Sequence, residues 1–177
     1  MRVAIFCADG LEQCECLVVY DLLHRAKIDT DLVRVGEGLE IKSSHGLLFK
    51  ANKLIDEINF NDYDALVLPG GIPGSDNLAA CKPLVEALKD FKAKGKLIAA
   101  ICAAPYIFVD NGLVSDGKFT CYPGFEHGLN STHNKVEVDD NVITARGLGA
   151  NFEFAYEIIK FLSDEELAKK VLDQIQY

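Results

Sequence analysis

Short apolar runs alternate along this chain with longer stretches whose apolar residues recur at helical spacing. The apolar runs have the length of buried strands, and the longer stretches have the period of helices packed on one face. Strands that alternate with helices in this way predict a mostly parallel sheet covered by helices on both faces, which is an α/β fold. The predicted strands are 3–7, 30–35, 65–68, 97–101, 136–138 and 142–144, and the predicted helices are 12–26, 83–94, one from about Ala103, 151–162, and one after a capping box at 163–166.

The remaining pattern indicates one folding unit. Residues 39–49 are expected to form a hairpin at the edge, and no internal repeat or Pro/Ser-rich linker divides the chain. A length of 177 residues fits one domain better than two. We therefore expect a single domain over residues 1–177.

Composition and charge narrow the classes of function. The formal net charge is −9, which argues against nucleic acids and anionic membrane surfaces as partners, because both bind basic faces. No apolar run approaches the roughly 20 residues that span a bilayer, and the N-terminal run is too short for a signal peptide. These features predict a cytoplasmic protein. The six cysteines form no zinc-binding pattern, so free thiols and no metal are expected.

Unusual residues follow three of the predicted strands. Ala8-Asp9-Gly10 and two glutamates follow the first, Pro69-Gly70-Gly71 follows the strand at 65–68, and Cys102 follows the strand at 97–101. Parallel strands end at one edge of their sheet, and open α/β sheets bind ligands there. We expect these segments to converge on one site.

Cys102 stands between a buried strand and a helix, where the chain must turn sharply. Ala100 and Ala104 are small residues two positions to either side, as a nucleophile turn requires. Such a turn predicts strained backbone dihedrals at Cys102. The following helix directs its N–H groups and positive dipole end towards the sulfur, which predicts a thiol pKa below the ordinary value. The same segment is equally consistent with an inert core cysteine.

The neighbouring strand ends carry weaker signals. Gly70 and Gly71 provide backbone that a ligand or an oxyanion can approach closely, although a plain tight turn has the same sequence. Glu12 and Glu15 both stand at a helix start, where a carboxylate simply complements the dipole. The residues alone do not distinguish Glu15 from Glu12.

Taken together, four segments resemble the ThiJ/PfpI family, in the branch of the Parkinson-disease protein deglycase and its bacterial relatives. The likeness covers nearly the whole chain. The segments are Gly10-Leu11-Glu12-Gln13-Cys14-Glu15, Val67-Leu68-Pro69-Gly70-Gly71, residues 97–105 around Cys102, and residues 144–155 from Thr144 to Ala155. The resemblance implies a flavodoxin-like three-layer sandwich, a homodimer and cofactor-free chemistry.

The resemblance also assigns roles to individual residues. It implies that Cys102 is the nucleophile and Glu15 its carboxyl partner, and that the Gly71 and Ala103 amides face the substituent on sulfur. Arg146 matches a family arginine near the pocket, although a solvated loop arginine is an equal alternative. In such a pair Glu15 would keep a proton and donate to sulfur, so its pKa should rise while that of Cys102 falls.

The chain departs from the family at two positions. The family's pocket histidine aligns with Tyr122, whose phenol is a poor base near neutral pH. Ala103 replaces the histidine that follows the cysteine in protease-like relatives, which disfavours a peptidase. His127 and His133 are interpreted as solvated loop histidines.

Three hypotheses follow. The first is a stress-protective, glyoxalase- or deglycase-like enzyme in which Cys102 adds to a small 2-oxoaldehyde substrate and Glu15 moves a proton. The second is a non-catalytic sensor of oxidative stress or a chaperone-like protein that uses the same oxidisable cysteine. The third is a binding module, for which no nucleotide motif is present.

Overall fold

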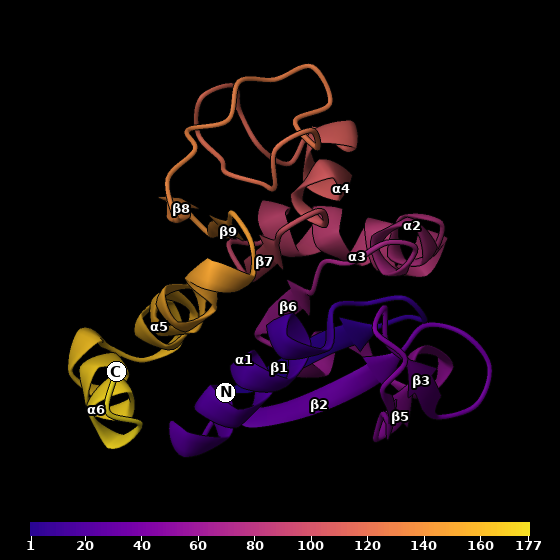
Figure 1. Cartoon of the computed structure of the whole chain (residues 1–177), viewed down its shortest axis with the longest axis horizontal. Coiled ribbons are helices and arrows are strands. Elements are labelled where there is room, and N and C mark those ends of the chain that lie inside the picture. Colours follow the sequence, from indigo (N-terminus) through magenta and orange to yellow (C-terminus); the bar gives the residue numbers. More distant parts are fainter.

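A seven-stranded sheet runs through the centre of the computed structural model, which describes residues 1–177 (Figure 1). The strand order is β5-β2-β1-β6-β7-β9-β8, and all neighbouring strands are parallel except the β8–β9 pair. The predicted mostly parallel, flavodoxin-like α/β arrangement is therefore confirmed. The strands are β1 (Arg2–Cys7), β2 (Asp29–Arg34), β5 (Lys53–Leu54), β6 (Ala65–Leu68), β7 (Leu97–Ile101), β8 (Val136–Asp139) and β9 (Val142–Ala145).

Helices cover both faces of the sheet because successive strand residues point to opposite sides. Ile5 and Val67 pack with the helices of one face, and Phe6 and Leu66 pack with those of the other. The first face carries α1 (Gln13–Arg25), α5 (Asn151–Leu162) and α6 (Glu165–Gln174), and the second carries α2 (Gly74–Ala79), α3 (Lys82–Ala93) and α4 (Pro105–Asp110). Each face thus has its own apolar core, and the sheet is buried between them.

Most element bounds lie within two residues of those predicted. The strands at 65–68 and 97–101 and the helix at 151–162 agree at both ends. The hairpin forms a separate antiparallel pair, β3 (Glu40–Lys42) and β4 (Leu48–Lys50). Short α2 and β5 were not predicted, nor were three single turns of 3₁₀ helix at Ile55–Glu57, Phe60–Asp62 and Leu148–Ala150.

Two helix starts differ from the prediction. The last helix is capped by Asp164 rather than Ser163, and the Asp164 carboxylate accepts a hydrogen bond from the Leu167 amide at 2.8 Å. The helix expected from Ala103 begins at Pro105 instead. The left-handed backbone of Cys102 requires an intervening turn before helical geometry starts.

The carboxyl ends of the central strands lie at one edge of the sheet. The register aligns Leu68 with Ala100 and Ile101 with Ala145, so the turns after β6, β7 and β9 are neighbours. Residues 111–135 contain no helix or strand and loop above α4 and β8 in Figure 1. No helix of the chain combines the length and the apolar character needed to cross a membrane.

Candidate active site

Cys102 stands on the sharp turn that leads from β7 towards α4. Its φ is +65°, a left-handed conformation that side-chain-bearing residues adopt uncommonly. Two backbone hydrogen bonds hold it there: the Cys102 amide donates to Ala145 O at 2.9 Å, and the Tyr122 amide donates to Cys102 O at 2.8 Å. The predicted strain at the elbow is confirmed, and the side chain remains half-buried rather than sealed in the core.

Glu15 lies in the first turn of α1 and is only 1% exposed. Its Oε2 accepts a hydrogen bond from the Gly70 amide at 2.9 Å, whereas Oε1 is buried without a hydrogen-bond partner. Burial raises the pKa of Glu15 from 4.5 to about 7, and the nearby Cys102 thiol and Gly70 amide oppose this shift. Near neutral pH this carboxyl can therefore both accept and donate a proton.

Position in the helix distinguishes Glu15 from Glu12, which the residues alone could not do and which only the family resemblance had implied. Glu12 is the N-cap of α1, and its carboxylate accepts from the Cys14 amide at 3.1 Å. That contact is the ordinary role of a side chain at a helix start. Glu15 instead points inward to the turn after β6, so the structure brings Glu15 and not Glu12 to the sulfur.

Gly70 separates the two reactive side chains and has no room for a side chain of its own. A Cβ at this position would lie 2.6 Å from Cys102 Cβ and 2.6 Å from Glu15 Oε2. Both distances are far below van der Waals contact. The glycine therefore allows the thiol and the carboxyl to approach each other across the backbone of this turn.

Two backbone amides face the sulfur, as the resemblance implied. The N–H groups of Ala103 and Gly71 lower the pKa of Cys102, and neither donates to a backbone carbonyl. Gly71 has a φ of +90°, a left-handed conformation that favours glycine. Two unengaged amides beside a nucleophile form the arrangement that stabilises an oxyanion.

The expected depression of the Cys102 pKa is wrong. Burial raises the pKa of Cys102 from 9.0 to about 12, and the Glu15 charge adds to this effect, whereas the Ala103 and Gly71 amides lower it by less. The expected rise at Glu15 agrees with the structure. Sulfur is therefore a thiol beside a carboxylate above pH 7, and the nucleophile forms when its proton passes to Glu15.

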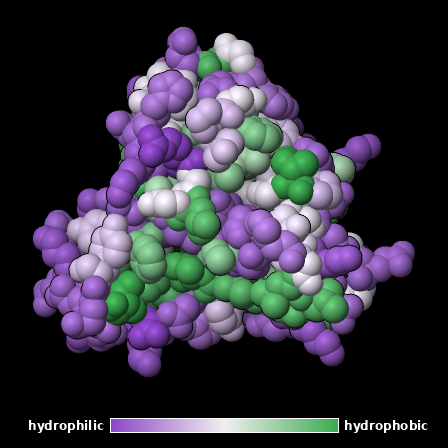
Figure 2. All heavy atoms as spheres, viewed as in Figure 1, coloured by the Kyte–Doolittle hydropathy of each residue, from purple (hydrophilic) through white to green (hydrophobic).

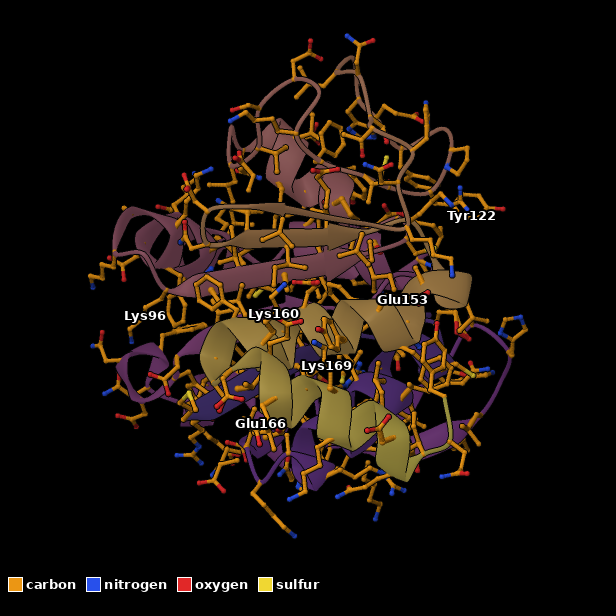
Figure 3. The ribbon with its side chains drawn as sticks, turned by 90° about the vertical axis from the view of Figure 1, so that its left-hand side faces the viewer. Lys96, Tyr122, Glu153, Lys160, Glu166 and Lys169 are labelled. Atoms are coloured by element: carbon orange, nitrogen blue, oxygen red, sulfur yellow. The ribbon has the colours of Figure 1, made fainter.

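Tyr122 and Arg146 lie at the mouth of the site rather than in contact with Glu15. Both line a cleft of about 280 Å³ whose floor is Gly147–Ala150. Tyr122 is 53% exposed, and Figure 3 places it at the outer surface, beyond the start of α5. Arg146 is also exposed, and its Nη1 donates only to His133 O, at 3.3 Å.

Sequence reasoning missed two parts of this region. The Leu148 amide faces Glu15 and lowers its pKa, and Lys135 lines the cleft beside Arg146. The signal for Lys135 was in the β8–β9 hairpin, because Val136 pairs with Ala145 and the next pair outward is Lys135 with Arg146. Counting back from the turn at residues 140 and 141 would have placed them opposite each other.

The histidines lie apart from this site. His127 is exposed and its Nδ1 lies 2.8 Å from Asp110 Oδ1, while exposed His133 contributes only its carbonyl. No group of three or more His, Cys, Asp or Glu side chains is placed to hold a metal ion. The chemistry available here is that of a thiol, a carboxyl and backbone amides.

This combination of a parallel α/β sheet, a strained cysteine turn and a buried carboxyl defines a cysteine-centred flavodoxin-like protein. The DJ-1/PfpI family model matches residues 1–161, and the chain belongs to that family. The Toxoplasma gondii DJ-1 structure, described as oxidized, superposes with a TM-score of 0.93 and 33% identity, over 99% of this chain and 98% of that one.

Similarity to curated relatives supports the same family assignment. Protein DJ-1 homolog B of Arabidopsis thaliana is 35% identical over 96% of this chain, which spans only 40% of that protein's length. The Glutathione-independent glyoxalase DJR-1.2 of Caenorhabditis elegans is 30% identical over 93% of this chain and 89% of its own length. The family of the chain is thus shown, and at least one relative is named for glyoxalase activity.

Proposed function

We propose that this protein is a cofactor-free glyoxalase- or deglycase-like enzyme that acts on small 2-oxoaldehydes. The observation that carries the proposal is the meeting of a strained, accessible Cys102, a buried Glu15 with a pKa of about 7, and two free amides. The similarity to a relative named as a glyoxalase supports the same activity.

The proposed reaction begins with addition of sulfur to the aldehyde carbon. Cys102 passes its proton to the Glu15 carboxylate as the S–C bond forms, and the Gly71 and Ala103 amides stabilise the oxyanion. Glu15 returns that proton to the oxyanion, which gives a hemithioacetal and restores the carboxylate. The charge of the pair is the same before and after this step.

The second stage moves a proton between adjacent carbons. Glu15 removes the proton from the former aldehyde carbon and delivers it to the former ketone carbon, while the hydroxyl proton of the hemithioacetal moves to the former ketone oxygen. The hemithioacetal is thereby converted into a thioester of a 2-hydroxy acid. Water then cleaves the thioester, and the 2-hydroxy acid leaves with the thiol regenerated. Tyr122 can orient the substrate in this scheme but shuttles no proton.

Turnover of methylglyoxal by the parent and by Cys102→Ser tests the proposal. We expect the parent to form lactate and the variant to lose at least about 10³-fold in kcat/KM, because the hydroxyl is a far weaker nucleophile. Cys81→Ser, at a half-buried cysteine outside the site, is the matched control and should keep its activity. Equal rates in the parent and Cys102→Ser would overturn the proposal.

An oxidative-stress sensor without turnover is the second candidate. The same geometry favours it, since Glu15 can donate a hydrogen bond to a sulfinate on Cys102 while the free amides hold its oxygens. A parent that lacks turnover but converts Cys102 to the sulfinate with hydrogen peroxide, ahead of the other cysteines, would favour this function.

We also propose that the chain forms a homodimer through the exposed face of α1. An apolar cleft of about 590 Å³ lies there, lined by Leu17, Val18, Phe152 and Ile175 among others, and Figure 2 shows a hydrophobic band across this face. Light scattering should give a dimer mass at micromolar concentration, and Leu17→Glu should shift it to the monomer. A monomeric parent would contradict the proposal.

A further inference from the structure

The cleft lined by Tyr122 and Arg146 extends the site outward from Cys102. Its floor, Gly147–Ala150, is shared with the sulfur, since a Cβ on Gly147 would lie 3.9 Å from Cys102 Sγ. The volume of about 280 Å³ accommodates a few non-hydrogen atoms beyond the sulfur. The far end of a molecule attached to sulfur has this cleft as its nearest open space.

Two basic residues, Lys135 and Arg146, line this cleft. The Arg146 amide donates to Lys135 O at 2.9 Å, which makes the two residues direct cross-strand neighbours beyond β8 and β9. Like charges directly opposite each other destabilise an antiparallel pair. In a chain with a net charge of −9, Glu153 offsets the Lys135 charge, and the Arg146 charge leaves this place locally positive.

Arg146 is the cation without a counter-charge. Lys135 Nζ lies 2.5 Å from Glu153 Oε1, but no carboxylate lies within 4 Å of the Arg146 guanidinium, which contacts only His133 O. Glu153 lies in the first turn of α5 (Figure 3), which follows the cleft residues Gly147–Ala150 in the chain. The guanidinium therefore keeps most of its donors available for a planar, bidentate acceptor.

The start of α5 adds to the positive potential. This 12-residue helix begins at Asn151, directly after the cleft floor, and no side chain caps its N-terminus. The positive end of its dipole therefore lies next to Gly147–Ala150. Glu153 in the first turn partly offsets this potential and pairs with Lys135, so the unpaired Arg146 guanidinium is the main positive group of the cleft.

We infer that this cleft selects substrates with an anionic end, so that the enzyme acts on 2-oxoaldehydes that carry a carboxylate or a phosphate a few bonds from the reacting carbon. The inference rests on the proposed function, because the aldehyde end must reach Cys102. Arg146 holds the anionic end and takes no part in the proton transfers. Its removal should therefore raise KM for anionic substrates and leave kcat nearly unchanged.

Turnover provides the first test. The probe is 4,5-dioxopentanoate, a 2-oxoaldehyde with a carboxylate, compared with neutral methylglyoxal. We expect Arg146→Gln to lower the ratio of the two kcat/KM values by about fivefold, as one exposed charge-assisted contact allows. Arg25→Gln is the matched control, because Arg25 pairs with Asp21 at the far end of α1. An unchanged ratio in Arg146→Gln would overturn the inference.

Alkylation of Cys102 provides a second test that needs no turnover. Iodoacetate and iodoacetamide both form an S–C bond with loss of iodide, and they differ only in charge. The ratio of their rates cancels the thiolate fraction. We expect this ratio to fall about fivefold in Arg146→Gln and to rise in Glu153→Gln, which frees Lys135.

The two tests separate the two ideas. A rate ratio that depends on Arg146 in a protein without turnover would refute the proposed function and leave anion recognition standing. Turnover with ratios that ignore Arg146 would refute the anionic substrate alone. Failure of both reagents to alkylate Cys102 would refute both.

Discussion

Cys102 and the pair Cys7–Cys16 place thiols in contrasting environments near the same edge of the sheet. Cys7 ends β1 and Cys16 lies on α1; both are fully buried, and their sulfur atoms are 3.5 Å apart. Cys102 is half-buried on a strained turn, with two free amides and Glu15 beside it. Cys16 adjoins Glu15 in sequence, yet its sulfur turns into the core.

The contrast shows that acidity does not distinguish the reactive thiol. The hydrogen bond to Cys7, together with burial, raises the pKa of Cys16, and burial with the Glu15 charge raises that of Cys102. Cys102 differs from Cys16 in that solvent can reach its sulfur and in that a proton acceptor lies beside it. Only Cys102 combines an open side with a carboxyl of pKa about 7 that can take the thiol proton.

The largest loss of activity is expected when Glu15, the proton acceptor of Cys102, is replaced. Glu15→Gln keeps the acceptor for the Gly70 amide but cannot take a proton, so we expect kcat/KM to fall by about 10²- to 10⁴-fold. In the parent, activity should rise with pH through about 7 as Glu15 ionises. That rise should disappear from the residual activity of the variant, as a pH–rate profile will show.

The same variant should be more stable than the parent at alkaline pH. The folded-state pKa of Glu15 is raised, so ionisation between pH 4.5 and 7 destabilises the parent. A shift from 4.5 to about 7 corresponds to a penalty of up to about 3 kcal/mol above pH 7 and none below pH 4.5. Urea unfolding at pH 4.5 and pH 8 measures this; a variant with no gain at pH 8 would contradict the raised pKa.

Alkylation rates compare the thiols directly. At pH 7 we expect iodoacetamide to modify Cys102 at least about 100-fold faster than Cys7 or Cys16, because the buried pair reacts only after local opening. Mass spectrometry of each cysteine in the folded parent gives the rates. If Cys102 labels no faster than the buried pair, the proposed nucleophile is refuted.

A smaller effect is expected at the mouth of the site. Tyr122→Phe should lower kcat/KM by less than about tenfold, since at most one hydroxyl contact is lost. A loss as large as that of Cys102→Ser would mean that Tyr122 carries a proton-transfer role in place of the family histidine. Steady-state kinetics on the same substrate decides between the two.

The smallest effect should come from the buried pair itself. Cys16→Ala removes a fully buried sulfur next to Glu15 in sequence, so we expect a loss of about 1 kcal/mol in stability. Turnover should change by less than about twofold at a temperature well below unfolding. A large loss of kcat with normal stability would show that Cys7 and Cys16 belong to the reaction.

Local sequence was sufficient to predict most of the elements and the sharp turn at Cys102, but it left open whether this cysteine is reactive. Strand and helix bounds follow from periodicity, which a few neighbouring residues determine. The elbow followed from Cys102 between Ala100 and Ala104 at a strand end, and parallel strands must bring their carboxyl ends together. The start of α4 was predicted near Ala103 but lies at Pro105, because the left-handed turn at Cys102 occupies the preceding residues.

Tertiary structure alone decided the chemistry at the elbow. Glu12 and Glu15 are equivalent by sequence, and only the packing of α1 against the turn after β6 buries one and leaves the other as a cap. The sign of the Cys102 pKa shift depended in the same way on how much water the surrounding segments exclude. The helix end and the amides would lower that pKa, but burial and Glu15 outweigh them.

The sequence by itself thus determined the α/β pattern and the sheet edge that carries the site, because each depends on residues close together in the chain. The family resemblance, and not the local pattern, selected Cys102 as its centre. Only the tertiary structure gave the physical reason for Glu15 rather than Glu12, raised the pKa of both partners and placed Arg146 beside Lys135 at the cleft. Desolvation and charge proximity are the physical reason. Both depend on contacts between distant segments, which periodicity does not record.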